Sequence, residues 1–210
     1  HAPLKRLSIE AQVSVLTIDH LKELQELRIL EIPCNTSVPA SALPLLPHSL
    51  TRLHAPLTWT LSPQMPASSY PPRLKALTSL GTQPTRRILS RLPHSLTDLR
   101  LDWSTLEPQD TIFLPLSLET LDLSQVASCD NFSLEHLHLP LLRSLALPNG
   151  VDLMQAFTTS PTIEILRLNS PINWSTKLKS HFPRLRELRL LVAPELADQN
   201  FIDTLPVSLD

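Results

Sequence analysis

The chain has 210 residues, a formal net charge of −2 and a pI of about 6.5. This balance argues against the strongly basic face of a nucleic-acid-binding domain, and no apolar run approaches the ~18 residues of a membrane-spanning helix. With 2 glycines and 21 prolines, the turns are expected to use proline, asparagine, aspartate and serine rather than glycine at positive φ.

One phrase, L-x-x-L-x-L or a close variant, recurs along the whole chain. Its spacing of 21 to 24 residues is typical of a solenoid, in which each unit contacts only its neighbours. We therefore expect residues 1–210 to form a single repeat domain of about nine repeats, cut from a longer protein. The copies begin at Leu4, Leu27, Leu50, Leu74, Leu96, Leu118, Leu142, Ile163 and Leu185, and a tenth opens at Leu209.

Each copy predicts one short strand. In LTDLRL (96–101), Leu99 and Leu101 point to one face, whereas Asp98, Arg100 and the following Asp102 point to the other, because strand side chains alternate. The rest of the period is long enough for a right-handed crossover that lays the next strand alongside in parallel. The leucines are then expected to stack in a continuous internal ladder.

The segments between the strands differ in kind. Residues 19–26, 152–157, 175–182 and 194–201 are rich in helix formers and predict short helices. Residues 33–49 contain four prolines, which favour an extended or 3₁₀-like path. We expect an outer layer of short helices and irregular turns.

A second phrase, L-P-x-S-L, precedes several strands. It reads LPHSL at 46–50 and again at 92–96, LPLSL at 114–118 and LPVSL at 205–209. Proline pre-sets φ on the way into a strand, and it fits only where no ladder hydrogen bond is needed from its nitrogen.

Together these phrases resemble the leucine-rich-repeat family over essentially the whole chain, and LPxSLTxL is similar to the FNIP-type and LPX-type subtypes. The resemblance implies an α/β solenoid: a right-handed superhelix with a parallel sheet on the concave face, and short helices, 3₁₀ turns and proline-rich loops on the convex face. FNIP-type arrays often accompany an F-box. The family's asparagine ladder is mostly missing. Only Asn35 holds that position, and the others are Gln12, Thr58, Thr82, Ser104, Val126, Gly150, Pro171 and Ala193.

The outward strand positions form two predicted columns across the sheet, and the resemblance implies that this concave face is the binding surface. The alternative is a solvated face with incidental charge. The residues expected to contact a partner are Glu31, Arg52, His54, Asp98, Arg100, Asp122, Arg167, Glu187 and Arg189.

Two pairs stand out in these columns. Arg100 and Asp122 are expected to be lateral neighbours that pair. Arg167 and Arg189 are also expected to be neighbours, and like charges side by side are unfavourable. We hypothesise that this end of the sheet meets an acidic or phosphorylated protein partner.

Trp59, Trp103 and Trp174 fall just after their strands, near the rim. Tryptophan is enriched at interface hot spots, and it equally fills a proline-lined turn. Both interpretations stay open.

Neither a cofactor nor a metal is predicted. Cys34 and Cys129 form no C-x-x-C pair, the repeated histidines His48 and His94 occupy the same place in LPHSL, and no catalytic or phosphate-binding motif occurs. Two reduced thiols favour an intracellular protein of the cytoplasm or nucleus. Three N-x-S/T sequons, at Asn35, Asn131 and Asn173, keep a secreted protein as the alternative.

The sequence therefore predicts a non-catalytic protein-interaction module. By resemblance, its first candidate role is substrate recognition in an F-box-type adaptor of the ubiquitin pathway. One alternative is a secreted or cell-surface receptor-like recognition protein. Another is the binding domain of an LPX-type effector ligase whose catalytic domain lies outside this chain.

Overall fold

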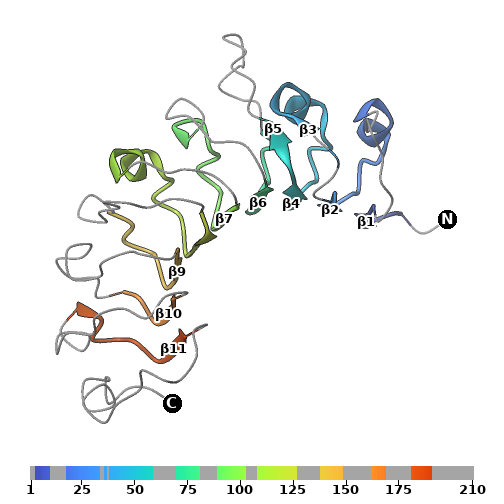
Figure 1. Ribbon diagram of the computed structural model, residues 1–210. Coiled ribbons are helices and arrows are strands. Elements are labelled where there is room, and N and C mark those ends of the chain that lie inside the picture. Colours follow the sequence, from blue (N-terminus) through green and yellow to red (C-terminus); the bar gives the residue numbers. More distant parts are fainter. Residues whose placement is uncertain are drawn as a thin grey trace.

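The computed structural model describes residues 3–9, 18–33, 36, 38–58, 70–80, 89–102, 108–126, 138–148, 162–168 and 181–190. The molecule is an open arc, with the strands stacked along its inner side and the connecting segments on its outer side (Figure 1). The first and last strands of the sheet, β1 (Arg6–Ser8) and β11 (Glu187–Leu190), lie at opposite ends of the arc (Figure 1). This is the solenoid that the repeat spacing predicts.

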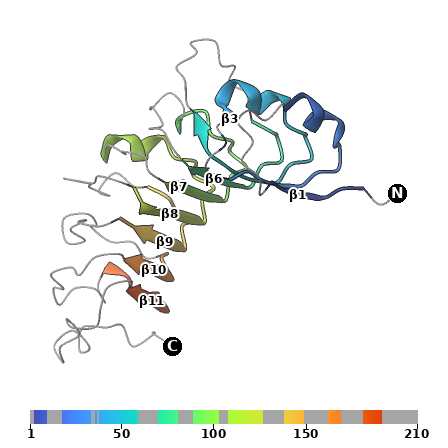
Figure 2. The same ribbon diagram turned by 45° about the vertical axis from the view of Figure 1, so that its right-hand side comes forward.

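Nine strands form one parallel sheet in which each strand pairs with the next repeat's strand. Figure 2 shows these strands stepping side by side along the arc. The predicted parallel solenoid is confirmed. The strands are β1 (Arg6–Ser8), β2 (Ile29–Glu31), β4 (Arg52–Ala55), β6 (Ala76–Leu80), β7 (Asp98–Asp102), β8 (Thr120–Gln125), β9 (Ser144–Leu147), β10 (Ile165–Leu168) and β11 (Glu187–Leu190).

The core is the predicted leucine ladder. From β2 to β10, the middle leucines of the phrase pair in register from strand to strand, and each is at most 1% exposed. Burying one leucine side chain contributes roughly 1.5–3 kcal/mol, so this column is a main source of stability. Its fully buried members are Leu30, Leu53, Leu77, Leu99, Leu121, Leu145 and Leu166.

The ladder is less covered at its two outermost strands. Leu4 is 47% exposed beside β1 and Leu190 is 40% exposed on β11. Among the described strands, each of the two has a neighbour on one side only, which accounts for the exposure.

One carbonyl oxygen sets the register at every step of the sheet. The Lys75 carbonyl accepts hydrogen bonds from the backbone N–H groups of Thr97 at 2.8 Å and Asp98 at 3.0 Å. The same doubly accepting carbonyl occurs at all eight steps between the nine strands, on Lys5, Arg28, Thr51, Lys75, Thr97, Glu119, Arg143 and Glu164. Because two donors share one acceptor, a slip of one residue breaks both bonds at that step.

The serine of L-P-x-S-L ties each repeat to the one before it. Ser95 Oγ donates to the carbonyl oxygen of Leu74 at 2.8 Å. Ser49 Oγ and Ser117 Oγ donate in the same way to Leu27 at 2.6 Å and Leu96 at 2.7 Å. A side-chain ladder therefore joins these turns, made by the serine that precedes each of these strands.

The proline of the same phrase lies in an apolar position under the turn. Pro47 and Pro115 are buried, and their carbonyl oxygens accept the N–H of the first leucine of the strand phrase. Where proline stands one position later, Leu139 and Phe182 occupy the buried position, and their carbonyl oxygens make the equivalent bond. The position requires an apolar group, and proline is one of several residues that fill it.

Three 3₁₀ helices lie on the outer side of the arc (Figure 1): η1 (Ile18–Glu23), η2 (Ala40–Leu45) and η3 (Pro108–Phe113). A short parallel pair, β3 (Val38–Pro39) and β5 (Leu57–Thr58), forms a second sheet. Among the described residues, no helix is long and apolar enough to cross a membrane.

The outcome for the outer layer is mixed. The extended and 3₁₀-like path predicted for residues 33–49 is confirmed by β3 and η2, which contains Pro44. The helix predicted at 19–26 is the 3₁₀ helix η1. The helices predicted at 152–157 and 194–201, and nearly all of 175–182, lie outside the described residues, so the helical outer layer stays a prediction.

Candidate functional site

The sheet register confirms both predicted columns of outward residues. One column runs Arg6, Ile29, Arg52, Ala76, Asp98, Thr120, Ser144, Ile165 and Glu187, and the other runs Ser8, Glu31, His54, Thr78, Arg100, Asp122, Ala146, Arg167 and Arg189. We call this surface the inner face. Every one of the nine residues predicted to contact a partner lies on it and stays open to solvent.

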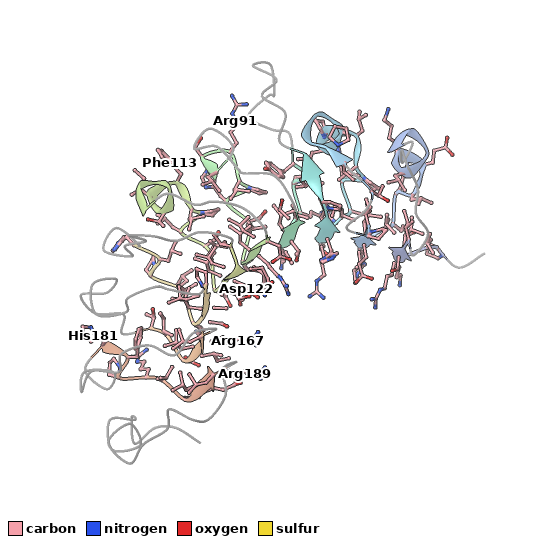
Figure 3. All side chains as sticks on the ribbon, in the orientation of Figure 1. Arg91, Phe113, Asp122, Arg167, His181 and Arg189 are labelled. Carbon is pink, nitrogen blue, oxygen red and sulfur yellow. The ribbon has the colours of Figure 1, made fainter. Side chains whose placement is uncertain are left out.

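Figure 3 shows both sides of the arc. Asp122, Arg167 and Arg189 lie along its inner side, whereas Phe113 and His181 lie on the outer side. The three tryptophans predicted near the rim, Trp59, Trp103 and Trp174, fall outside the described residues.

An ion pair joins the side chains of the first two strands on the inner face. Arg6 Nη2 donates to both carboxylate oxygens of Glu31, at 3.0 and 2.9 Å. These hydrogen bonds lower the pKa of the Glu31 carboxyl. The Arg6 side chain is 64% exposed, so the pair contributes at most about 1 kcal/mol to stability. Its main effect is to hold two side chains in one arrangement.

A second charge cluster occupies the centre of the face. Arg100 Nε lies 3.9 Å from Asp122 Oδ2, which confirms the predicted lateral pairing. The closer contact is one that the sequence did not predict: Arg100 Nε donates to Asp102 Oδ1 at 2.9 Å, and the Asp102 side chain is only 5% exposed. The hydrogen bond with Asp102 raises the pKa of Arg100. Arg100 is therefore held by two carboxylates.

Asp122 is fixed from the other side as well. Its Oδ1 accepts the backbone N–H of Ser124 at 3.0 Å. The register between β7 and β8 shifts between Arg100 and Asp102, so that Asp102 pairs with Gln125. This irregularity accompanies the buried carboxylate of Asp102 at the centre of the face.

The last strands bring two arginines together, as predicted. Arg167 and Arg189 are direct partners in the β10–β11 register. Arg189 Nε donates to Glu187. Arg167 has no ion pair among the described residues, and its buried Nε has no hydrogen-bond partner there. Arg167 therefore retains an unused donor beside a like charge.

The position next to Arg167 on the other side is occupied by a small side chain. Ala146 on β9 is its register partner and is buried. Arg143 Nη1 contacts Glu164 Oε1 at 3.5 Å, just before these strands begin. Ala146 therefore offers Arg167 no opposite charge on the β9 side.

One buried polar group on the outer half was missed by the sequence reasoning. Tyr70 occupies the leucine position of L-P-x-S-L and is buried, and its hydroxyl has no hydrogen-bond partner among the described residues. Burial raises the pKa of the Tyr70 phenol. The signal for this residue was its alignment with Leu46 and Leu92.

The described residues contain no group of three or more His, Cys, Asp or Glu side chains arranged to hold a metal ion. No model of a known protein family matches the chain, and no curated protein matches its sequence.

Proposed function

We propose that this chain is a non-catalytic protein-interaction module of the leucine-rich-repeat type, and that its inner face binds another protein. The observation that carries the proposal is the inner face: nine parallel strands present polar columns in fixed register over a buried leucine ladder. A stiff scaffold lowers the conformational entropy lost on binding. A curved polar sheet is the usual contact surface of such solenoids.

The test compares variants of the inner face with variants of the turns. Arg52→Glu with Asp98→Lys changes two exposed inner-face side chains without touching the core. Arg73→Glu with Glu26→Lys, both exposed in turns, is the matched control with the same net charge. Affinity capture from the native host should lose its specific partners with the first variant and keep them with the second. Equal capture by both would contradict the proposal.

We further propose that the bound protein is acidic or phosphorylated where it meets Arg167 and Arg189. The like-charged register pair and the free Arg167 Nε support this. An anion between two guanidinium groups relieves their repulsion and supplies the missing acceptor. Arg167→Glu with Arg189→Glu should weaken binding of the captured partner, while Lys22→Glu with Arg73→Glu, an equal charge change at exposed positions outside the sheet, should not. Unchanged affinity for the first variant would remove the idea.

The first biological role to test is substrate recognition in an F-box-type ubiquitin-ligase adaptor inside the cell. The support is the LPxSLT phrase at residues 46–51 and 92–97, whose serine and threonine both bind the preceding repeat. Co-purification of the full-length protein with an F-box-binding ligase subunit is the expected result. A mobility shift on glycosidase treatment of native protein would instead support the secreted alternative.

A further inference from the structure

Charge on the inner face, taken together with the residue just before each strand, is divided into three blocks along the sheet. The division becomes clear when the residues already held in ion pairs are set aside: Arg6 with Glu31, Arg100 with Asp102 and Asp122, Arg143 with Glu164, and Arg189 with Glu187. What remains are charged side chains of the strands, and of the residue just before each strand, that have no ion pair among the described residues.

The first block is basic and the second is acidic. Arg52 on β4 and Lys75 just before β6 are exposed cations, and Lys5 and Arg28 extend this block toward β1. Asp98 on β7 and Glu119 just before β8 are exposed anions. Asp98 accepts a hydrogen bond from Thr97 Oγ1 at 2.6 Å, which fixes its carboxylate without neutralising it. The acidic block lies in the middle of the sheet.

The third block is basic again. Arg167 on β10 and Arg186 just before β11 are the remaining cations there, and Arg186 is exposed. The order along the inner face is therefore positive, negative, positive. In the strand order β4-β6-β7-β8-β9-β10-β11, two strand spacings separate the centre of the Arg52–Lys75 pair from that of the Asp98–Glu119 pair. Three spacings separate the latter from the Arg167–Arg186 pair.

These spacings predict how far apart the charged groups of a bound peptide lie. At ~4.8 Å per strand, the block centres lie about 10 and about 14 Å apart. An extended peptide advances about 3.3 Å per residue, so the two distances correspond to about three and about four residues. Complementary charges fix the register of a bound segment and exclude wrong partners more than they raise affinity.

We infer that the inner face takes an extended protein segment that crosses the strands with a basic group in its middle and an acidic or phosphorylated group on each side, about three and about four residues away. This inference rests on the proposed function and specifies the partner of the same surface. The central basic group lies over Asp98 and Glu119. The two acidic groups lie over the Arg52–Lys75 and Arg167–Arg186 pairs.

The test uses the whole chain and synthetic peptides. The matched peptide reads Asp-Asp, a single Gly, Lys-Lys, a Gly-Ser spacer and Asp-Asp, which puts the centres of the charged pairs about three and about four residues apart. One control peptide has the same composition with the two lysines moved to one end, and another replaces them by glycine. Fluorescence anisotropy at low ionic strength should give about tenfold tighter binding for the matched peptide than for either control, and the difference should shrink with added salt.

A charge-reversed protein supplies the decisive comparison. In Asp98→Lys with Glu119→Lys, both changes are at exposed positions outside the core. This variant should bind the matched peptide about tenfold more weakly than the unaltered chain does, and should bind the lysine-free acidic peptide more tightly. Equal binding of the matched and permuted peptides, or no binding of either, would overturn the three-block inference. The proposed function is tested separately, by affinity capture with the inner-face and turn variants.

Discussion

Replacing Ser95 with alanine tests whether the serine ladder holds neighbouring repeats together. Ser95 Oγ donates to the carbonyl oxygen of Leu74 at 2.8 Å, in a partly buried position, and Leu74 is fully buried. The net loss of such a bond is about 0.5–1.5 kcal/mol, and an acceptor that water reaches poorly adds to it. We expect Ser95→Ala to lower the free energy of unfolding by about 1–2 kcal/mol. For a chain of this size, the midpoint temperature falls by about 4 °C.

Unfolding in urea is monitored by circular dichroism. If the slope of the unfolding free energy against urea concentration is unchanged, the variant exposes the same amount of surface on unfolding as the unaltered chain. His94→Ala is the matched control: His94 is the preceding residue of the same turn, and it is exposed. Its substitution is expected to change stability by less than about 0.5 kcal/mol. Equal stabilities of the two variants would refute the role given to the hydroxyl, and with it the explanation of the L-P-x-S-L phrase.

Three further predictions concern the core and the buried polar groups. Leu121→Ala should lower the free energy of unfolding by about 2–5 kcal/mol in urea titrations. Thr120→Ala, at the outward neighbour, should change it by less than about 0.5 kcal/mol. Similar values for the two variants would contradict the role of the leucine ladder as the core. Arg100→Ala should destabilise by about 1–3 kcal/mol because it leaves Asp102 buried without its partner, and adding Asp102→Asn should recover part of the loss. Tyr70 is the single tyrosine of the chain, so phenolate absorbance reports on it alone. Because burial raises its pKa, the native chain should titrate well above pH ~10 and the urea-unfolded chain near pH ~10. The corresponding stability is fully present below that pH and is lost as pH rises toward the folded pKa, and native titration near pH ~10 would contradict the burial.

Two regularities of the sequence predicted the sheet well. The repeat of 21 to 24 residues fixes which strands are neighbours, and the alternation of leucine with polar residues fixes which side chains face inward. The register of Arg167 with Arg189 followed from these two facts alone.

The contacts of individual polar groups were harder to predict. The sequence showed that serine recurs in L-P-x-S-L, but its acceptor on the preceding repeat depends on how closely the turns stack. Asp102 was placed on the outward row, yet it is buried and contacts Arg100 where the β7–β8 register shifts. A register shift depends on the packing of two chain segments, which no single repeat encodes.

The buried position under the turn shows why the phrase tolerates variation. Proline fills it in some repeats, whereas Leu139 and Phe182 fill it in others. In both cases the carbonyl oxygen of that residue accepts the same N–H. Sequence patterns built on the proline alone therefore miss repeats that obey the same physical requirement.

The carbonyl oxygen that accepts two hydrogen bonds at each strand step affects how such a protein can gain or lose repeats in evolution. Since every step makes the same two bonds to the repeat before it, removing one whole period in frame joins two compatible surfaces. The spacing of 21 to 24 residues shows that a difference of one residue is absorbed between the strands, whereas the loss of one residue within a strand would turn the leucines that follow it outward. Gene duplications and losses of whole units can thus lengthen or shorten the reach of the array while each joint stays the same.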